Sequence, residues 1–235
     1  KRLGFHNVIE AALGADLVAY NEAKELEEKG FLTSSCCPTF VAYIKKNFPK
    51  LIPNISHNPS PMAALAKWIK ENEPTAKVVF IGPCVSKKME IKQESVKPYV
   101  DYVLTFEELQ ALIDARNIDL ESLEESPLDN ASYFGRIFAR VGGLSDAVVQ
   151  ALKEQESTFE AKSYVCDGIE NFRLALLKAQ SGKADFNFIE GMGCIGGCIG
   201  GPCCLNHEIK DKTQVDKYGK MSKEQTIKDS IRILQ

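Results

Sequence analysis

The stretch FNFIEGMGCIGGC, residues 186–198, joins a short apolar run to a glycine-rich loop that carries two cysteines. The run FNFIE is typical of a strand buried in a sheet. The same succession occurs twice more, because KVVFI (77–81) precedes Cys84 and SYVC (163–166) ends on Cys166. Parallel α/β sheets bind ligands beyond the carboxyl ends of their strands. The chain is therefore predicted to be an α/β protein whose cysteine-bearing loops meet in a cleft.

Short apolar runs alternate with amphipathic helical patterns along the chain, which is typical of parallel βα units. We predict two βα lobes with parallel sheets on either side of a central cleft, roughly residues 15–130 and 131–206. The predicted strands are ADLVAY (15–20), KVVFI, DYVLTF (101–106), SYVC and FNFIE. The predicted helices cover residues 21–30, 40–48, 62–70, 107–116, 144–155, 169–183 and part of 223–234, and residues 117–132 are predicted to be a polar surface segment.

Composition narrows the class of protein. Hydrophobic residues make up 44% and charged residues 26% of the 235, as in ordinary globular proteins. A formal net charge of -3 gives no support to a nucleic-acid or anionic-membrane partner. Since no apolar run approaches the roughly 20 residues of a membrane helix, and no signal peptide is recognisable, we expect a cytoplasmic protein. The sequence does not begin with Met, and we expect further chain upstream.

Eight cysteines in a chain of this size need a chemical explanation. A secreted disulfide framework is one, but a chain of this length can bury a sufficient core without such cross-links. Two of the pairs are adjacent in sequence, and neighbouring cysteines rarely bridge each other. Clustered cysteines in a cytosolic protein more often bind metal or carry out redox chemistry. We therefore favour a metal site built from some of Cys36, Cys37, Cys84, Cys166, Cys194, Cys198, Cys203 and Cys204.

Three segments hold most of these cysteines, namely SSCCP (34–38), GPCVSKKME (82–90) and EGMGCIGGCIGGPCC (190–204). Zinc ribbons use paired C-x2-C knuckles and simple ferredoxins use a C-x2-C-x2-C run, and the sequence has neither. Cys194 and Cys198 are spaced as C-x3-C, and the glycines between them would let the backbone approach a bulky cluster and donate N–H groups to its sulfides. One cysteine from each of the first two segments and this pair would supply the four thiolates of a 4Fe–4S cubane.

SSCCP, PCVSKKME and EGMGCIGGC, in this order, resemble the three signature segments of the FeFe-hydrogenases. The resemblance covers about residues 15–198, and Lys and Glu stand at the family's offsets after Cys84. It implies the H-cluster domain of a large subunit, from a divergent branch and lacking its N-terminal part and an upstream ferredoxin-like domain. The implied cofactor is a 4Fe–4S cubane joined by a cysteine thiolate to a two-iron unit with CO, cyanide and azadithiolate ligands. The central cleft would then hold an iron–sulfur cluster.

The resemblance assigns roles to a set of residues around this cofactor. The implied ligands of the cubane are Cys37, Cys84, Cys194 and Cys198, of which Cys198 would bridge to the two-iron unit. Lys87 matches a lysine that hydrogen-bonds a cyanide, a charge-assisted contact, and Glu90 would position neighbouring groups. The other residues implied to line the pocket are Ser60 near the second cyanide, Met192 beside the two-iron unit, and Phe138.

Heterolytic H2 chemistry needs carriers that move protons between a buried metal site and water. Glu22 and Glu25 lie three residues apart on one face of a predicted helix, where without the motifs they would be interpreted as a solvated surface. The resemblance implies a catalytic route from the thiol of Cys36 through Glu25 and Ser56 to Glu22 at the surface. Lys29 stands where the family has an arginine near the exit.

Three departures from the family pattern mark a divergent site. Gly82 stands in place of a methionine near the bridging ligand, Met62 in place of a glutamine beside a cyanide, and GGPCC (200–204) in place of GGGQP. These changes leave the ligands intact, so we expect them to tune potential and rate. Cys166 is expected to be a buried structural thiol. The resemblance gives no role to the two cysteines of GGPCC, and the three histidines have no metal-ligand spacing and are assigned no function.

The activity that the resemblance implies is the reversible oxidation of H2 to protons and electrons. The implied electron partner is a ferredoxin or an upstream ferredoxin-like domain, because the sequence carries no accessory-cluster motif, and maturation proteins would insert the two-iron unit. Two other functions stay open, a hydrogen sensor with little turnover and an iron–sulfur assembly protein that lacks the two-iron unit. Cys36 and Lys87 favour the enzyme, because turnover requires a proton relay and cluster carriage does not.

Overall fold

The computed structural model describes residues 1–208 and 211–234. The strands are β1 (Leu32–Thr33), β2 (Val79–Gly82), β3 (Tyr102–Thr105), β4 (Ser163–Asp167) and β5 (Phe188–Met192). The α-helices are α1 (Ala11–Lys29), α2 (Pro38–Asn47), α3 (Pro61–Asn72), α4 (Ser86–Glu90), α5 (Phe106–Ala115), α6 (Tyr133–Ile137), α7 (Gly143–Glu154), α8 (Gly168–Gln180), α9 (Asp211–Gly219) and α10 (Ile227–Ile231). Short 3-10 helices occur at η1 (Pro49–Asn54), η2 (Cys198–Gly200) and η3 (Arg232–Leu234).

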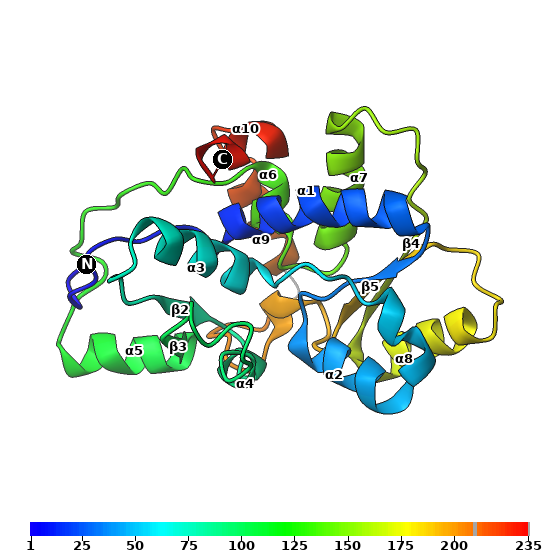
Figure 1. The fold of residues 1–235 in the computed structure, drawn as a ribbon. Coiled ribbons are helices and arrows are strands. Elements are labelled where there is room, and N and C mark those ends of the chain that lie inside the picture. Colours follow the sequence, from blue (N-terminus) through cyan, green and yellow to red (C-terminus); the bar gives the residue numbers. More distant parts are fainter. Residues whose placement is uncertain (209–210, 235) are drawn as a thin grey trace.

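The strands pair in parallel, as predicted. Within the described residues, β5 lies between β1 and β4 in one sheet and β2 pairs with β3 in another, and Figure 1 shows these sheets in opposite halves of the molecule. β1 belongs in sequence to the predicted lobe 15–130, yet it pairs with β5, so the sheets do not follow a boundary at residue 130. The predicted parallel α/β architecture is confirmed.

Residues 11–29 form one helix, α1, and the strand predicted for residues 15–20 is therefore wrong. Buried side chains of α1 recur every three or four residues at Ala15, Ala19, Ala23 and Leu26. The run ADLVAY is apolar because this part of the helix is buried on more than one side, and a short apolar run does not distinguish such a helix from a strand. The predicted end of the helix is confirmed, because Gly30 adopts φ 72° and its N–H donates to the carbonyl of Leu26.

The helices predicted from amphipathic patterns are observed as α2, α3, α5, α7, α8 and α10, with ends that differ by a few residues. Residues 117–132 contain neither helix nor strand, and residues 117–130 are exposed or half-buried as expected, but Ala131 and Ser132 are buried. Helices α4, α6 and α9 have no counterpart among the predictions. The first two are too short to display a hydrophobic period, and α9 is almost entirely polar.

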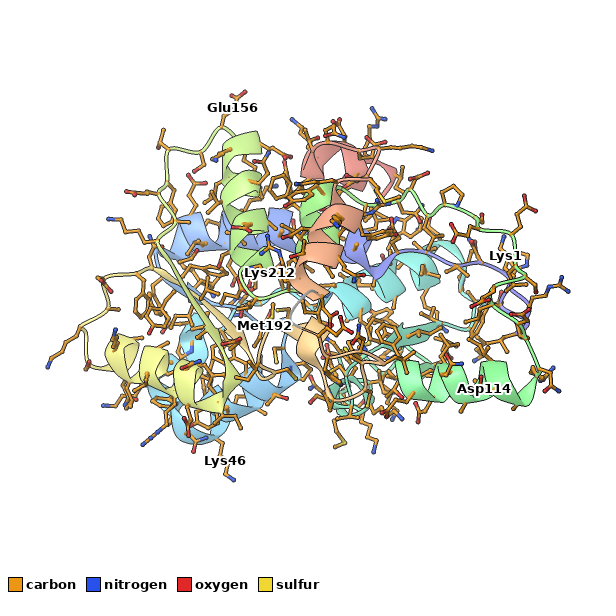
Figure 2. The ribbon with its side chains drawn as sticks, turned by 180° about the vertical axis from the view of Figure 1, so that it is seen from behind. Lys1, Lys46, Asp114, Glu156, Met192 and Lys212 are labelled. Atoms are coloured by element: carbon orange, nitrogen blue, oxygen red, sulfur yellow. The ribbon has the colours of Figure 1, made fainter. Side chains whose placement is uncertain are left out.

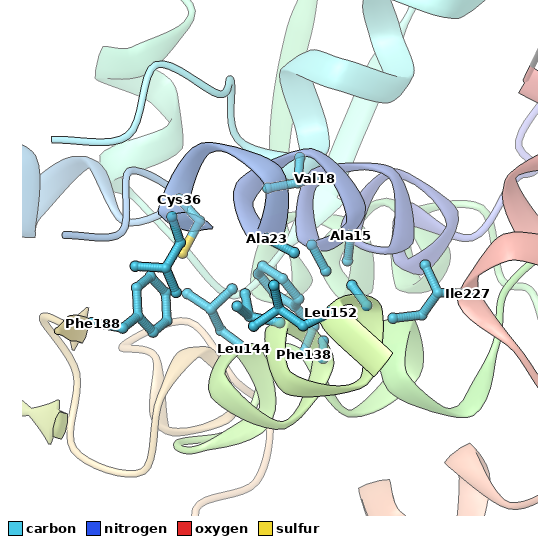
Figure 3. Close-up of a cluster of buried hydrophobic side chains, with 14 of the residues drawn as sticks. Ala15, Val18, Ala23, Cys36, Phe138, Leu144, Leu152, Phe188 and Ile227 are labelled. Atoms are coloured by element: carbon cyan, nitrogen blue, oxygen red, sulfur yellow. The ribbon is translucent and has the colours of Figure 1, made fainter. Parts of the chain in front are cut away.

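The largest hydrophobic cluster joins α1, α7 and β5, and Figure 3 shows its side chains packed below α1. Cys36 and Phe138 lie in this cluster together with Leu144 and Phe188. Met192 belongs to the same cluster. Three residues that the sequence predicts for the cofactor site are therefore set into the main core, where close packing restricts their movement.

The segment that follows the last cysteine packs back onto α1 through a buried polar contact. The carboxylate of Asp16 accepts hydrogen bonds from the hydroxyl of Ser132 at 2.6 Å and from the hydroxyl of Ser230 at 2.7 Å. Burial raises the pKa of Asp16 to about 6 despite these bonds. This contact holds α10 against α1 and thereby closes one side of the main core. Within residues 1–208 and 211–234, no helix combines the length and the apolar character that a membrane span requires.

Candidate iron–sulfur site

Each of the four predicted ligands of the cubane follows the carboxyl end of a strand. Cys37 comes after β1 and precedes the first residue of α2, and Cys84 lies between β2 and α4. Cys194 follows β5, and Cys198 begins η2. In Figure 1 the orange segment that contains the last two cysteines lies between the two sheets. The ligand-bearing loops therefore meet where parallel strands of both halves end, the usual position of a site in open α/β sheets.

The four thiols lie near enough to one another to affect each other's protonation. The pKa of the Cys198 thiol is raised to about 12, chiefly by burial and also by Cys37, Cys84 and Cys194, whereas Lys87 opposes the rise. Burial also raises the pKa of Cys194, with added contributions from Cys37, Cys84 and Cys204. Such a set of half-buried thiols becomes stable as thiolates when a metal binds them. All eight cysteines, each within the described residues, are free.

The chemistry of these side chains fits an iron–sulfur cluster, because a cubane is held by four cysteine thiolates, each of which binds a different iron. The backbone also fits this cofactor, since the N–H of Gly193 points to the sulfur of Cys37 at 3.4 Å. Amide N–H groups aimed at sulfur are typical around iron–sulfur clusters.

Glycine is required in the loop between Cys194 and Cys198. Gly196 and Gly197 adopt φ of 83° and 87°, a region that other residues avoid. A Cβ atom on Gly197 would lie 2.6 Å from the backbone nitrogen of Val141. The loop therefore packs directly against the segment between α6 and α7, and it presents the two cysteines from a tightly constrained backbone.

Glu190 holds that segment in place, a role that the sequence did not predict although the residue stands in the EGMGC motif. Its fully buried carboxylate accepts the backbone N–H of Gly142 at 2.7 Å and that of Ser145 at 2.8 Å. The N–H of Cys198 in turn donates to the carbonyl of Ala139 at 2.7 Å. Glu190 thus caps the first turn of α7 from the neighbouring strand and fixes the backbone to which Cys198 is bonded.

We expect Glu190→Ala to lower the free energy of unfolding by about 1–3 kcal/mol, because two buried N–H groups lose their acceptors. It should also lower the iron content after reconstitution, since the backbone beside Cys198 loses its anchor. Glu154→Ala is a matched control, because Glu154 accepts the N–H groups of Ile227 and Lys228 at 3.1 and 2.8 Å and so caps α10 in the same way. Chemical denaturation and iron analysis would contradict this role of Glu190 if both variants kept wild-type iron content.

The residues predicted to surround a two-iron unit are all buried. The ammonium of Lys87 lies 2.6 Å from a carboxylate oxygen of Glu90 and 3.1 Å from the carbonyl oxygen of Cys36. Ser60 accepts the N–H of Ala63 at the start of α3. Met192 is the last residue of β5, and Figure 2 shows it near the middle of the molecule.

Two of the three departures from the family pattern are set in apolar surroundings. Met62, at the start of α3, is buried among apolar side chains that include Val96 and Val103. A Cβ atom on Gly82 would lie 2.8 Å from the ring of Phe80, so that ring occupies space beside the end of β2.

The structure reverses the order predicted for the two glutamates of α1. Glu22 has no exposed surface, whereas the side chain of Glu25 is 12% exposed and lies 2.7 Å from the ammonium of Lys29. Burial raises the pKa of Cys36 well above its usual range, and Glu22 is the largest charged contributor to that rise. Glu22 therefore lies on the side of Cys36, and Glu25 lies toward the surface. The helical period puts both residues on one face but does not say which end of that face is buried.

Ser56 lies between the two carboxylates. Its hydroxyl donates to Glu25 at 2.9 Å. Ser56 also lies near enough to Glu22 to lower its pKa slightly against burial, yet among the described residues neither oxygen of Glu22 has a partner at hydrogen-bond geometry. Burial prevails and raises the pKa of Glu22 to about 8. Glu22 is therefore a protonated acid at neutral pH in the folded protein.

The raised pKa of Glu22 makes the folded state bind a proton that the unfolded state releases. Its stabilising effect is complete below the ordinary pKa of 4.5 and is lost as pH rises through about 8. We expect the free energy of unfolding to fall on the order of a few kcal/mol between these limits. Glu22→Gln should flatten this dependence in denaturation measured across pH, and exposed Glu28→Gln should leave it unchanged. An unflattened curve in Glu22→Gln would contradict the burial argument.

Two residues that contact Glu25, His57 and Asn58, were given no role from the sequence. The side-chain amide of Asn58 donates to Glu25 at 2.9 Å, and Nδ1 of His57 lies 2.8 Å from the other carboxylate oxygen. Both follow Ser56 directly in sequence. No spacing rule marks them, because their contact with α1 depends on how the segment after η1 crosses that helix.

Cys166, Cys203 and Cys204 are the cysteines to which the resemblance gives no role. Cys166 is buried, its thiol donates to the carbonyl of Glu190 at 3.1 Å, and burial raises its pKa to about 12. These properties agree with the expected structural thiol. The thiol of Cys204 donates to the carbonyl of Ile199 at 3.1 Å, next to η2, and Cys203 is buried.

Comparison with known proteins agrees with this geometry. The family described as "Iron only hydrogenase large subunit, C-terminal domain" matches residues 1–202. Iron hydrogenase 1 of Clostridium pasteurianum is 27% identical over 264 aligned residues, which cover 92% of this chain and 46% of the relative. The cytosolic Fe-S cluster assembly factor NAR1 of Kluyveromyces lactis is 36% identical over 96 residues, covering 41% of this chain and 20% of that protein.

A solved structure of the FeFe-hydrogenase HydA(deltaEFG) has the same fold, with a TM-score of 0.77, 23% identity, and coverage of 99% of this chain and 80% of that one. The chain spans about half the length of the first hydrogenase relatives, 46% and 47%. Cysteines from three loops, a shared fold and a family match over residues 1–202 lead to one conclusion. The chain belongs to the family of the iron-only hydrogenase large subunit, C-terminal domain.

Proposed function

We propose that the chain holds an H-cluster and interconverts H2 with protons and electrons. The observation that carries this proposal is a buried acid, Glu22, that acts on the buried thiol of Cys36, with Ser56 close by and bonded to the carboxylate of Glu25 nearer the surface. A protein that only carries a cubane has no use for such a costly burial of an ionisable group. Perturbed acids in contact with a cluster of ligands are typical of catalytic sites.

In this proposal Cys37, Cys84, Cys194 and Cys198 would hold the cubane, and Cys198 would also hold the two-iron unit. When bound, the cofactor supplies the redox chemistry that interconverts H2 with two protons and two electrons. Lys87, held by Glu90 and by the carbonyl of Cys36, offers a buried cation to the anionic ligands of the two-iron unit. Ser60, Met192 and Phe138 complete the pocket and exclude water from it.

Protons move through side chains of this chain only. Cys36 remains a thiol at neutral pH, because burial and the nearby Glu22 disfavour the thiolate. Glu22 titrates near pH 8, so it can give and take a proton under ordinary conditions. Ser56 then links it to Glu25, which meets solvent beside Lys29. The proposed order is Cys36, Glu22, Ser56 and Glu25.

The partners follow from the same proposal. The proposed electron partner is a ferredoxin or a ferredoxin-like domain, and maturation proteins would supply the two-iron unit. The cofactor, the electron partner and a cytoplasmic location are proposals that rest on the family and on the composition of the chain.

A second function is favoured by a specific similarity. The assembly factor NAR1 is 36% identical to part of this chain, which is higher than the 27% of Iron hydrogenase 1, although over 96 rather than 264 residues. An assembly protein would use the same four cysteines for a cubane and would have no need of Cys36 or Glu22 as proton carriers.

Infrared spectroscopy separates the two functions. After maturation with the two-iron unit, the hydrogenase proposal expects CO and cyanide bands together with H2 evolution from a reduced dye. Absence of these bands after a procedure that loads a known hydrogenase would overturn it. The assembly function expects a protein that takes up only a cubane and passes it to a cluster-free acceptor, which iron analysis of the acceptor would detect.

A further inference from the structure

Glu25, at the outer end of the proposed route, touches a histidine to which the family pattern gives no role. The Nδ1 atom of His57 lies 2.8 Å from Oε1 of Glu25. The backbone N–H of His57 donates to the same carboxylate at 3.0 Å, so the contact is fixed by the main chain as well. The side chain of His57 is 80% exposed, against 12% for that of Glu25. The imidazole thus connects a nearly buried carboxylate with solvent.

Lys29 completes this contact from the next turn of α1. Its ammonium lies 2.7 Å from Oε1 of Glu25 and 3.2 Å from Nδ1 of His57. A lysine only donates hydrogen bonds, so Nδ1 accepts from Lys29 when it carries no proton. When Nδ1 is protonated it donates to Glu25 instead. One nitrogen atom therefore has a defined partner in each protonation state.

Among the described residues, the contacts of the His57 ring with charged side chains are those with Glu25 and Lys29. Glu25 and Lys29 are the charged groups, both from α1. The segment that carries His57 contributes Ser56 and Asn58, which are uncharged and bind Glu25. From η1, the carbonyl of Pro53 accepts from Lys29 at 3.5 Å.

We propose that His57 is the solvent end of the proton route and exchanges protons between Glu25 and water, an inference that rests on the proposed hydrogenase function. In the outward direction Glu25 passes its proton to Nδ1 of the neutral ring, and the resulting imidazolium releases the proton of Nε2 to water. The ring then loses the Nδ1 proton and regains one on Nε2 by exchange with water, which its exposure allows. The inward direction is the reverse, and no electron is transferred in either.

A histidine at this position has a clear physical benefit. Burial would raise the pKa of Glu25, but hydrogen bonds from Lys29, from the N–H of His57 and from Ser56 outweigh it and lower that pKa. A carboxylate stabilised in this way seldom holds a proton near neutral pH, whereas an imidazole is the side chain suited to that range. The imidazole of His57, with Nδ1 2.8 Å from Glu25, therefore offers a second group through which a proton can pass to or from that carboxylate.

Nuclear magnetic resonance can test whether the protonation of His57 affects Glu25, and this test needs no H2 turnover. The 13Cδ resonance of Glu25 in the full chain should change in two steps with pH, one for its own carboxyl group and one for the neighbouring imidazole. The second step should vanish in His57→Gln and persist in His6→Gln, which removes another exposed imidazole. A single step in the wild type would overturn the inference, whatever the protein does with H2.

Turnover gives the second test, on variants matured to equal cluster content. His57→Gln should lower H2 evolution about three- to tenfold, less than loss of a group at the reacting atoms, because water still reaches Glu25. His57→Ala should lose as much and regain most of its rate on addition of free imidazole, and His6→Gln should be unaffected.

A purely structural role of His57 predicts no rescue, because the backbone bond to Glu25 survives in both variants. Full activity of His57→Gln, or failure of imidazole to rescue His57→Ala, would overturn the inference. Two titration steps in a protein that never evolves H2 after competent maturation would instead contradict the proposed function.

Discussion

Cys198→Ser is expected to abolish stable binding of the cubane. Cys198 is the thiol whose pKa burial and the other three cysteines together raise to about 12, so it lies where all four ligands meet. Even the loss of a group that only supports a ligand typically costs 10- to 100-fold in metal affinity, and loss of the ligand itself should exceed about 100-fold. Iron and sulfide analysis after reconstitution, with visible absorption of the cluster, would measure the effect.

Cys166→Ser provides the matched control for this prediction. Cys166 is equally a buried cysteine, but its thiol donates to the carbonyl of Glu190, a bond that a serine hydroxyl can also make. We expect this variant to keep the cubane. Normal iron content in Cys198→Ser, with loss of iron in Cys204→Ser, would mean that the ligand set includes the cysteine beside η2 instead.

Cys36→Ala is expected to keep both parts of the cofactor and to lose H2 evolution by about 10²- to 10⁴-fold, the range for removal of a positioned acid–base group. The thiol is 9% exposed and is packed in the main core beside the proposed ligands, so water has no direct way to replace it. Evolution from a reduced dye, normalised to infrared bands of the loaded site, would measure the loss.

The control for this prediction is Cys203→Ala. Cys203 is another buried cysteine, 7% exposed, and it has no place in the proposed route. We expect near wild-type evolution from it. Activity retained by Cys36→Ala would show that protons reach the site by another route. A loss of infrared bands in the same variant would show that Cys36 supports the cofactor rather than the proton.

Short sequence patterns predicted those strands and turns that depend mainly on neighbouring residues. Apolar runs followed by cysteines predicted parallel strands with a site at their carboxyl ends, and the strand pairs and the three loops agree. The glycines between the paired cysteines were predicted to let the backbone approach a cluster, and in the structure Gly196 and Gly197 adopt positive φ angles that other residues avoid. A thiol, a strand and a tight turn each follow from a few adjacent residues.

Contacts between distant segments determine two features that the sequence patterns did not settle, namely the helical form of ADLVAY and the burial of Glu22. ADLVAY is equally apolar as a strand and as a helix buried on several sides, and contacts with distant segments made it part of α1. The same contacts determine which end of the Glu22–Glu25 face is buried.

Glu190 and His57 are the clearest cases that only the tertiary structure decided. Glu190 caps a helix that begins about 47 residues earlier, at Gly143, and His57 meets a carboxylate 32 residues away on α1. The parallel strands were predictable from the sequence by itself, because hydrophobic periodicity depends on neighbouring residues. The direction of the proton route and its solvent end depend on burial, and burial is set by segments that meet only in the folded chain.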